Sequence, residues 1–230
     1  MGPSFSYQGQ DQFVIEASGR QRNGFFLDSG ASNGVRGNNT VVLESLYDWQ
    51  GICVEPNAAL YAELKENRSC VCLDCCLYTN DGPVEFFEAG QVYGGIVSEY
   101  EPAHLEFARA FAAGEAARQR PKALLAPVTK QARTIRSILR DHGAPSVIDY
   151  WSLDTEGSEL ALLRSFPFDE FRIRYLTVEH NHSPVRGHIR AFLAAKGFRH
   201  ARSLGIDDAY IWVGRDGAPA WRSRAWPARH

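Results

Sequence analysis

Two acidic residues that follow successive apolar segments are the side chains in this chain best suited to hold a ligand. Residues 25–27 form a short apolar strand that ends at Asp28 and leads into a glycine-bearing turn. A second apolar strand, residues 52–54, ends at Glu55. A strand, a glycine turn and a second strand that ends on a carboxylate form the first half of a nucleotide-binding Rossmann site.

The turn favours S-adenosylmethionine over a dinucleotide. A pyrophosphate needs the backbone N–H groups of a G-x-G-x-x-G turn, whereas this turn has only Gly30 and Gly34, four residues apart. The Asp28 carboxylate would repel a pyrophosphate but attract the ammonium group of a methionine moiety. Glu55 is placed to accept charge-assisted hydrogen bonds from two ribose hydroxyls. An NAD(P)-dependent oxidoreductase is the rival enzyme class, and a strand–turn–helix without ligand is the structural alternative.

The composition is that of an ordinary globular domain. The chain has 230 residues, of which 44% are hydrophobic and 23% charged, and its formal net charge is −2. This charge predicts no nucleic-acid partner. No apolar run is long enough to cross a membrane, and residues 1–12 lack the apolar core of a signal peptide. We therefore expect a cytoplasmic protein with no membrane partner.

Four of the five cysteines lie close together, at positions 70, 72, 75 and 76. No second pair and no nearby histidine completes a metal site. We interpret these cysteines as small core residues in a reducing cytoplasm rather than as metal ligands or a disulfide framework.

Alternating strands and helices predict an α/β fold with a mostly parallel sheet that is covered on both faces. Strands are expected at 24–28, 51–55, 70–73, 148–154, 175–179, 198–204 and 209–213, with an extra strand at 84–87. Helices are expected at 39–48, 57–67, 134–142, 157–166 and 185–196. One domain, 1–230, would contain an N-terminal segment at 1–23, an inserted region at 93–127 with a helix at 101–119, and a tail at 215–230.

Several segments, in order along the chain, resemble the FkbM-type family of S-adenosylmethionine-dependent methyltransferases. They are residues 7–11, 26–34, 39–40, 43–44, 49–57, 152–159 and 177–181. The resemblance implies the class I methyltransferase fold, a Rossmann-like seven-stranded sheet whose last strand is antiparallel. It also implies a cofactor site formed by Asp28, Ser29, Gly30, Asn33, Gly34, Asn39, Thr40, Glu55, Asn57 and Asp74. Asp74-Cys75 departs from the Asn-Ala that is frequent in the family at this place.

The reacting end is expected where the fourth and fifth strands end, at Asp154 and Glu179. Asp154 or His180 could act as a general base, and histidine suits this role because its ordinary pKa is about 6.5. Alternatively, Asp154, Glu179 and Asn181 could bind Mg²⁺, an arrangement similar to that of catechol-type O-methyltransferases. His180 could also be a loop histidine without a chemical role.

Seven basic residues and no acidic residue lie between positions 118 and 140. The spacing of Arg133, Arg136 and Arg140 predicts that they share one helix face. This face is either a solvated surface or a dock for an anionic or carrier-bound substrate.

The sequence thus predicts a methyltransferase that acts on a small molecule, most directly by O-methylation of a hydroxyl or carboxyl of a secondary metabolite or sugar. N-methylation and a non-catalytic protein that binds the cofactor or a carrier are the alternatives. The assembly state is open, with a homodimer as one candidate.

Overall fold

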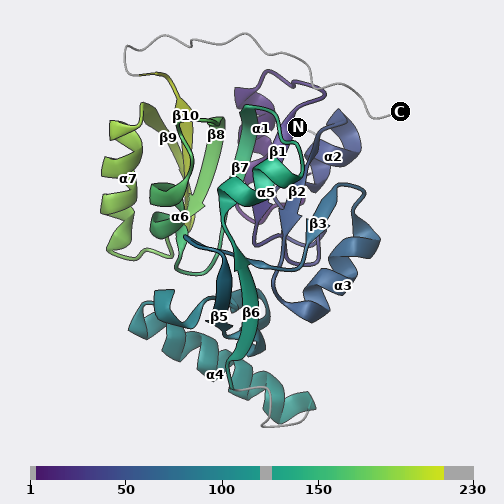
Figure 1. Ribbon diagram of the computed structural model, residues 1–230, viewed down its shortest axis with the longest axis vertical. Coiled ribbons are helices and arrows are strands. Elements are labelled where there is room, and N and C mark those ends of the chain that lie inside the picture. Colours follow the sequence, from purple (N-terminus) through teal and green to yellow (C-terminus); the bar gives the residue numbers. More distant parts are fainter. Residues whose placement is uncertain (1–3, 120–125, 215–230) are drawn as a thin grey trace.

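The computed structural model describes residues 4–119 and 126–214, so the predicted tail at 215–230 lies outside the described residues (Figure 1). Its centre is a seven-stranded sheet with the strand order β3-β2-β1-β7-β8-β10-β9. In chain order these strands are β1 (Phe25–Ser29), β2 (Gln50–Val54), β3 (Val71–Leu73), β7 (Val147–Leu153), β8 (Arg172–Glu179), β9 (Phe198–Leu204) and β10 (Asp207–Trp212).

The pairing of the strands confirms the expected sheet. β1 pairs in parallel with both β2 and β7, and β7 pairs in parallel with β8. β10 is antiparallel to both β8 and β9 and lies between them. All five residues of β1 are buried, as an apolar central strand that is covered on both faces requires.

Helices cover both faces of this sheet. On one face pack α5 (Ile135–Asp141), α6 (Glu159–Ser165) and α7 (Val185–Ala195). On the other face pack α1 (Gln10–Ala17), α2 (Val41–Tyr47) and α3 (Ala58–Asn67). Successive side chains of β7 point to opposite faces of the sheet, so Trp151 packs with the first group of helices and Tyr150 with the second. No helix among the described residues is long and apolar enough to cross a membrane.

A second, smaller unit interrupts the alternation of strands and helices between β3 and α5. It contains a three-stranded sheet of β4 (Cys76–Leu77), β6 (Val128–Arg133) and β5 (Gly82–Phe86), in that order. The 3₁₀ turns η1 (Glu88–Tyr93) and η2 (Val97–Glu99) and the long helix α4 (Pro102–Gln119) complete it. Figure 1 shows this unit below the carboxyl ends of the main strands, and we call it the insert.

Most predicted elements are confirmed within a few residues, including the inserted helix, which is α4. The sequence did not reveal α1, β4 or β6. The predicted shared helix face of Arg133, Arg136 and Arg140 is wrong, because Arg133 is the last residue of β6 and only the other two lie on α5. The five cysteines are free; Cys75 and Cys76 are buried, whereas Cys70 and Cys72 are only partly buried against the core.

Candidate active site

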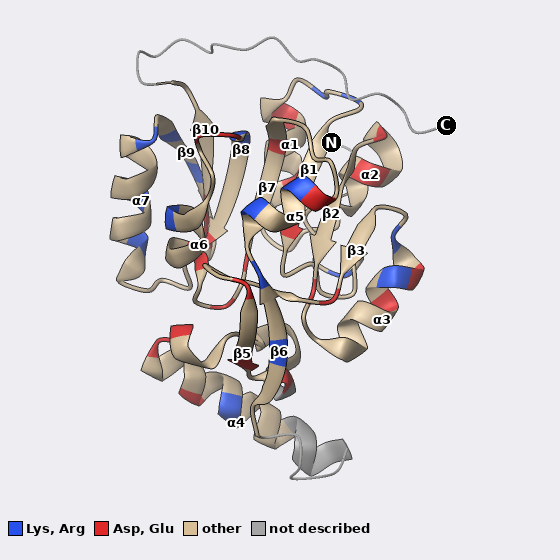
Figure 2. Ribbon diagram, viewed as in Figure 1, with Lys and Arg blue, Asp and Glu red and all other residues tan. Residues whose placement is uncertain are grey.

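A cavity of about 470 Å³ lies between the main sheet and the insert. The main sheet contributes residues at the carboxyl ends of three strands, Asp28, Glu55 and Asp154, whereas the insert contributes an apolar wall that includes Phe86 and Ile96. Figure 2 shows acidic residues gathered in the loops between the two units. The cavity has the volume of an ordinary small-ligand site and opens where ligands of α/β sheets bind.

Glu55 is held rigidly where β2 ends. Its Oε2 accepts a hydrogen bond of 2.8 Å from the backbone N–H of Ser32, and its Oε1 accepts one of 2.8 Å from that of Asn57. Burial raises the pKa of Glu55 to about 7, although these two N–H groups lower it. Asn57 in turn begins α3, because its side chain accepts from the N–H groups of Ala59 and Leu60.

Asp28 lies at the opposite end of the same turn and is fully buried. Its Oδ2 accepts hydrogen bonds from Asn38 Nδ2 at 2.9 Å and from Thr40 Oγ1 at 2.7 Å. Burial raises the pKa of Asp28, and the Arg68 guanidinium opposes that change. Next to it, Asn39 lines the cavity and donates to Ser152 Oγ, while its Oδ1 has no partner among the described residues.

Gly30 is required where β1 and β7 approach each other. It has φ of +84°, and a Cβ at this position would lie 1.8 Å from the backbone oxygen of Asp154. A larger residue would push Asp154 away from the cavity. The glycine predicted for the cofactor turn thus also fixes the position of the acid that ends β7.

Three carboxyl groups meet at the end of β7 and β8. Oxygen atoms of Asp154, Glu156 and Glu179 all lie within 4.8 Å of one another. Burial raises the pKa of all three. Repulsion from Glu156 raises the pKa of Asp154 and Glu179 further, whereas His104 lowers the pKa of Glu156. Asp154 and Glu156 line the cavity. We call these three residues the acid cluster.

The insert supplies a basic partner to the acid cluster. His104, on α4, places its Nε2 2.9 Å from Glu156 Oε2, and this contact raises the pKa of His104. Asn181 also interacts with the Glu156 carboxyl and lowers its pKa. Glu156 itself has φ of +58°, a conformation that non-glycine residues adopt mainly at special sites.

His180 faces away from this cluster, although it follows Glu179 directly. Its Nδ1 accepts a hydrogen bond of 3.0 Å from the backbone N–H of His182, and its Nε2 lies 3.8 Å from Asp208 Oδ1. Burial lowers the pKa of His180, and Arg186 lowers it further. The structure therefore separates His180 from the cavity that Asp154 lines.

The residues predicted for the cofactor divide into two groups. Asp28, Gly30, Asn39 and Glu55 line the cavity. The others lie behind the lining: Asn33 shapes the turn, Thr40 bonds Asp28, Asn57 begins α3 and the Ser29 hydroxyl accepts from Trp151 Nε1. Gly34 packs beside Leu64 and Arg68, and Asp74 acts on Glu55 through its charge. Sequence reasoning missed four residues: Tyr7, Arg36 and Asn38, which line the cavity, and His104.

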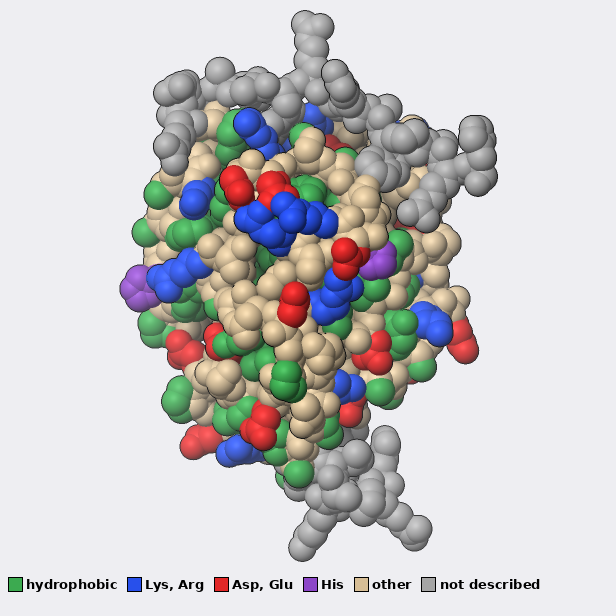
Figure 3. All heavy atoms as spheres, in the orientation of Figure 1, with side chains coloured by type: hydrophobic (Ala, Val, Ile, Leu, Met, Phe, Trp, Pro, Cys, Tyr) green, Lys and Arg blue, Asp and Glu red, His purple; other side chains and the backbone are tan. Residues whose placement is uncertain are grey.

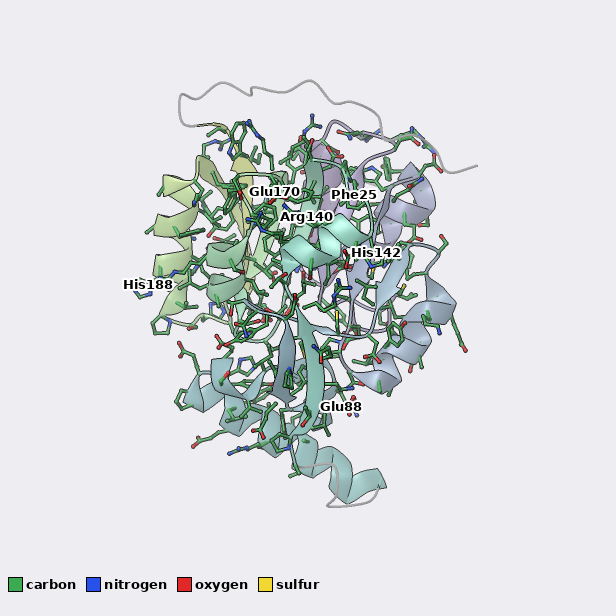
Figure 4. All side chains as sticks on the ribbon, viewed as in Figure 1. Phe25, Glu88, Arg140, His142, Glu170 and His188 are labelled. Atoms are coloured by element: carbon green, nitrogen blue, oxygen red, sulfur yellow. The ribbon has the colours of Figure 1, made fainter. Side chains whose placement is uncertain are left out.

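The three arginines proposed as a substrate dock are paired within the chain and do not line the cavity. Arg133 pairs with Asp141, Arg136 with Asp169 and Glu170, and Arg140 with Glu170 at 2.8 Å. Figure 4 shows Arg140 and Glu170 side by side near α5, away from the insert. Basic and acidic side chains are mixed on this face of the molecule (Figure 3), so it offers no broad positive field.

Comparisons with known proteins found one family model and several similar solved structures. A model of the methyltransferase FkbM domain matches residues 28–200. The N-terminal domain of human METTL16 is a similar solved structure, with 11% identity, a TM-score of 0.45 and coverage of 92% of this chain and 71% of that one. An rRNA methyltransferase, aviRa from Streptomyces viridochromogenes, has 13% identity, a TM-score of 0.37 and coverage of 91% and 85%. No curated relative matches the sequence.

The prediction that excluded nucleic acid as a partner is wrong. A further similar structure is the hMettl16 catalytic domain in complex with the MAT2A 3'UTR hairpin 6, with 12% identity, a TM-score of 0.37 and coverage of 92% and 72%. The exclusion relied on a formal net charge of −2, and an overall charge does not describe the local surface that a nucleic acid would contact.

Proposed function

Because this chain belongs to the FkbM methyltransferase family and therefore uses S-adenosylmethionine, we propose that it methylates a hydroxyl oxygen held beside Asp154 and Glu156. The observation that carries the proposal is the acid cluster at the wall of the cavity. A hydroxyl is a weak nucleophile until a base removes its proton, and buried carboxyl groups of raised pKa are suited to that task near neutral pH.

The residues of the cavity fit the cofactor. Glu55 presents a carboxylate that is already fixed by two backbone N–H groups, as ribose hydroxyls need. The free Oδ1 of Asn39 and the nearby carboxyl of Asp28 suit an ammonium group. When bound, the cofactor supplies an electrophilic methyl group on a positively charged sulfur.

Glu156 is the base that we favour. A carboxylate oxygen of Glu156 would accept the hydroxyl proton as the acceptor oxygen takes the methyl group that the cofactor would supply, with S-adenosylhomocysteine as the leaving group. His104 keeps Glu156 in place and, when protonated, stabilises its carboxylate form. Asp154 and Glu179 lie close enough to share the proton afterwards.

The same charges favour a neutral acceptor over a carboxylate. An acceptor with its own negative charge would enter a site that already contains three carboxyl groups, and like charges repel most strongly where water is excluded. We therefore propose the hydroxyl of a sugar or secondary metabolite rather than a carboxyl group. The arginines of β6 and α5 do not favour an anionic substrate, since each is paired with an acid of this chain.

A divalent cation is a second role for the acid cluster. Carboxylate oxygens are the ligands that Mg²⁺ prefers, and the three groups converge on one point, with Asn181 beside Glu156. Asp154, Glu156 and Glu179 would hold such an ion, and it would supply a Lewis acid that makes a nearby hydroxyl easier to deprotonate.

The test is formation of S-adenosylhomocysteine with a panel of neutral alcohols, sugars, carboxylates, amines and an RNA hairpin, with Mg²⁺ or with EDTA. We expect turnover with a neutral hydroxyl acceptor, and a loss of about a hundredfold or more in kcat for Glu156→Gln. Glu106→Gln is the matched control, because Glu106 is an exposed acid of α4.

Three results would contradict parts of the proposal. Full activity of Glu156→Gln together with Asp154→Asn would exclude the acid cluster as the base. Methylation of amines or carboxylates alone would exclude a hydroxyl acceptor. Loss of activity in EDTA that Mg²⁺ restores would favour the metal role.

A further inference from the structure

The charges around the cavity are strongly unequal. Four acidic side chains line it, Asp28, Glu55, Asp154 and Glu156. Among the described residues, Arg36 is the one Lys or Arg in the lining. A single cation in an acidic cavity is of interest because the cofactor carries both charges, an ammonium and a sulfonium on one side and a carboxylate on the other.

The backbone of Arg36 is fixed by the turn between β1 and α2. Asn33 Oδ1 accepts hydrogen bonds from the N–H groups of Val35, at 3.2 Å, and of Arg36, at 3.0 Å. Gly34 and Gly37 on either side have φ of +79° and +68°, which directs the chain sharply around Arg36. The base of the Arg36 side chain is therefore held at one place beside the cavity.

The guanidinium of Arg36 is exposed and unused. Within residues 4–119 and 126–214, no carboxylate pairs with it and no acceptor takes a hydrogen bond from it. Several other arginines have acidic partners: Arg68 pairs with Glu44, and Arg186 and Arg190 pair with Asp208. Arg36 is thus available for a ligand.

Arg36 lies at the methionine end of the cavity. Two residues further along the chain, Asn38 bonds the Asp28 carboxyl at 2.9 Å, and the next residue is Asn39 with its free Oδ1. Glu55, which suits the ribose, lies at the end of the neighbouring strand β2. The oxygen atoms of Asp28 and Asn39 Oδ1 can accept from the ammonium group, but these acceptors cannot bind the carboxylate.

We propose that Arg36 binds the α-carboxylate of the methionine moiety and so selects ligands that carry an amino-acid end. The inference rests on the S-adenosylmethionine cofactor, not on the nature of the acceptor. A guanidinium can donate two parallel hydrogen bonds to a carboxylate, a geometry that lysine cannot reproduce. Because the side chain is exposed, we expect a contribution of about tenfold in affinity rather than the larger effect of a buried pair.

Two ligands separate this role from general effects on the cavity. S-Adenosylhomocysteine carries the amino-acid end, whereas 5′-methylthioadenosine has the same adenosine and sulfur but no carboxylate. We expect calorimetry to show that Arg36→Gln lowers the affinity for S-adenosylhomocysteine about tenfold and leaves the affinity for 5′-methylthioadenosine unchanged. Arg36→Lys should retain part of the affinity for S-adenosylhomocysteine. Arg164→Gln is the control, because Arg164 is an exposed arginine of α6 outside the cavity lining, and it should leave the affinity for both ligands unchanged.

Each other result overturns the proposal. Equal affinity of Arg36→Gln and wild type for S-adenosylhomocysteine would show that the guanidinium does not contact the carboxylate. Equal weakening of both ligands would indicate a disturbed cavity, and thermal unfolding of the variant would show whether the fold had changed. If the wild-type protein bound neither ligand, the cofactor assignment itself would be wrong. Failure of the Arg36 proposal can therefore be told apart from failure of the cofactor assignment.

Discussion

At the scale of residues, the site gathers acidic side chains in surroundings that disfavour their ionised forms. Glu55, Glu156 and Glu179 are buried and Asp154 is half-buried, and burial raises the pKa of each. Such groups are costly to the fold, because each ionises less readily than it does in water. Their concentration around one cavity therefore indicates a binding or catalytic role rather than a contribution to stability.

Glu55 should couple cofactor binding to pH. Its pKa in the free protein is about 7, raised from 4.5, so the carboxyl is largely protonated below neutral pH. Ribose hydroxyls donate to the ionised form, and binding should therefore release a proton. We expect the affinity for S-adenosylhomocysteine to rise between pH 6 and pH 8, as calorimetry in buffers of different ionisation enthalpy would measure.

Glu55→Gln is the matched variant for this prediction. An amide cannot ionise, so its weaker binding should be independent of pH over the same range. A pH dependence that persists unchanged in the variant would assign the proton to another group, of which Asp207, with its pKa also raised to about 7, is the nearest candidate.

The site residues at strand ends could be predicted from the sequence, whereas Arg36, Asn38 and His104 could not. Asp28, Glu55 and Asp154 each follow an apolar run, and parallel strands bring their carboxyl ends to one edge. His180 has the same kind of position, but the turn after it, with φ of +43° at Asn181 and +55° at His182, accompanies a ring directed towards β10. Adjacency in sequence does not fix the direction of a side chain.

At the scale of elements, the insert determines what surrounds the acceptor. β6 has a mainly exposed pattern without clear alternation, so its pairing with β5 and β4 was not evident from its own residues. The helix α4 was predicted, but not its contact with the acid cluster, because tertiary position is not encoded by local periodicity. His104 illustrates this limit, because it comes from α4 and contacts Glu156 of the acid cluster.

Replacement of His104 should affect turnover more than cofactor binding. The raised pKa of His104 means that its positive charge, which supports the Glu156 carboxylate, is present at low pH and is lost as pH rises through that pKa. We expect His104→Gln to lower kcat about tenfold or more, to remove the alkaline fall of the pH profile and to leave S-adenosylhomocysteine affinity unchanged.

The control for this variant is His188→Gln on α7, where the histidine is exposed on the outer side of the helix (Figure 4). It should match the wild type in every measurement. An unchanged pH profile in His104→Gln would show that α4 only covers the site and takes no part in proton transfer.

At the scale of the whole molecule, the cavity lies between two units that hydrogen bonds also join, such as those from Asn57 Nδ2 to the Glu88 carbonyl and from Ser183 Oγ to Glu101. The main sheet contributes the acids, and the insert contributes the apolar wall and α4 (Figure 1). A ligand that fills the cavity therefore contacts both units at once. Binding should stabilise the folded chain as a unit, since the ligand has no equivalent site in the unfolded chain.

Thermal unfolding measures this linkage. At S-adenosylhomocysteine concentrations about a hundred times the dissociation constant, the stabilisation is about 2.7 kcal/mol, which corresponds to a rise in Tm of about 5–10 °C for a chain of this size. The variant with both Asp28→Ala and Glu55→Ala should show no such rise. A rise of equal size in that variant would place the ligand elsewhere.

The hydrogen bond between Gln10 Nε2 and Asp207 Oδ2, at 3.1 Å, joins residues 197 positions apart. The charge of Asp207 also raises the pKa of Asp154 and Glu179. The surroundings of the acid cluster therefore depend on β10, and through Gln10 on α1, near the two ends of the described chain. During synthesis, β1 and β2 emerge long before β10, and contacts between distant segments form late. We therefore expect a nascent chain that has not yet produced β10 to lack the final charge environment of the acid cluster, since Asp207 is then absent.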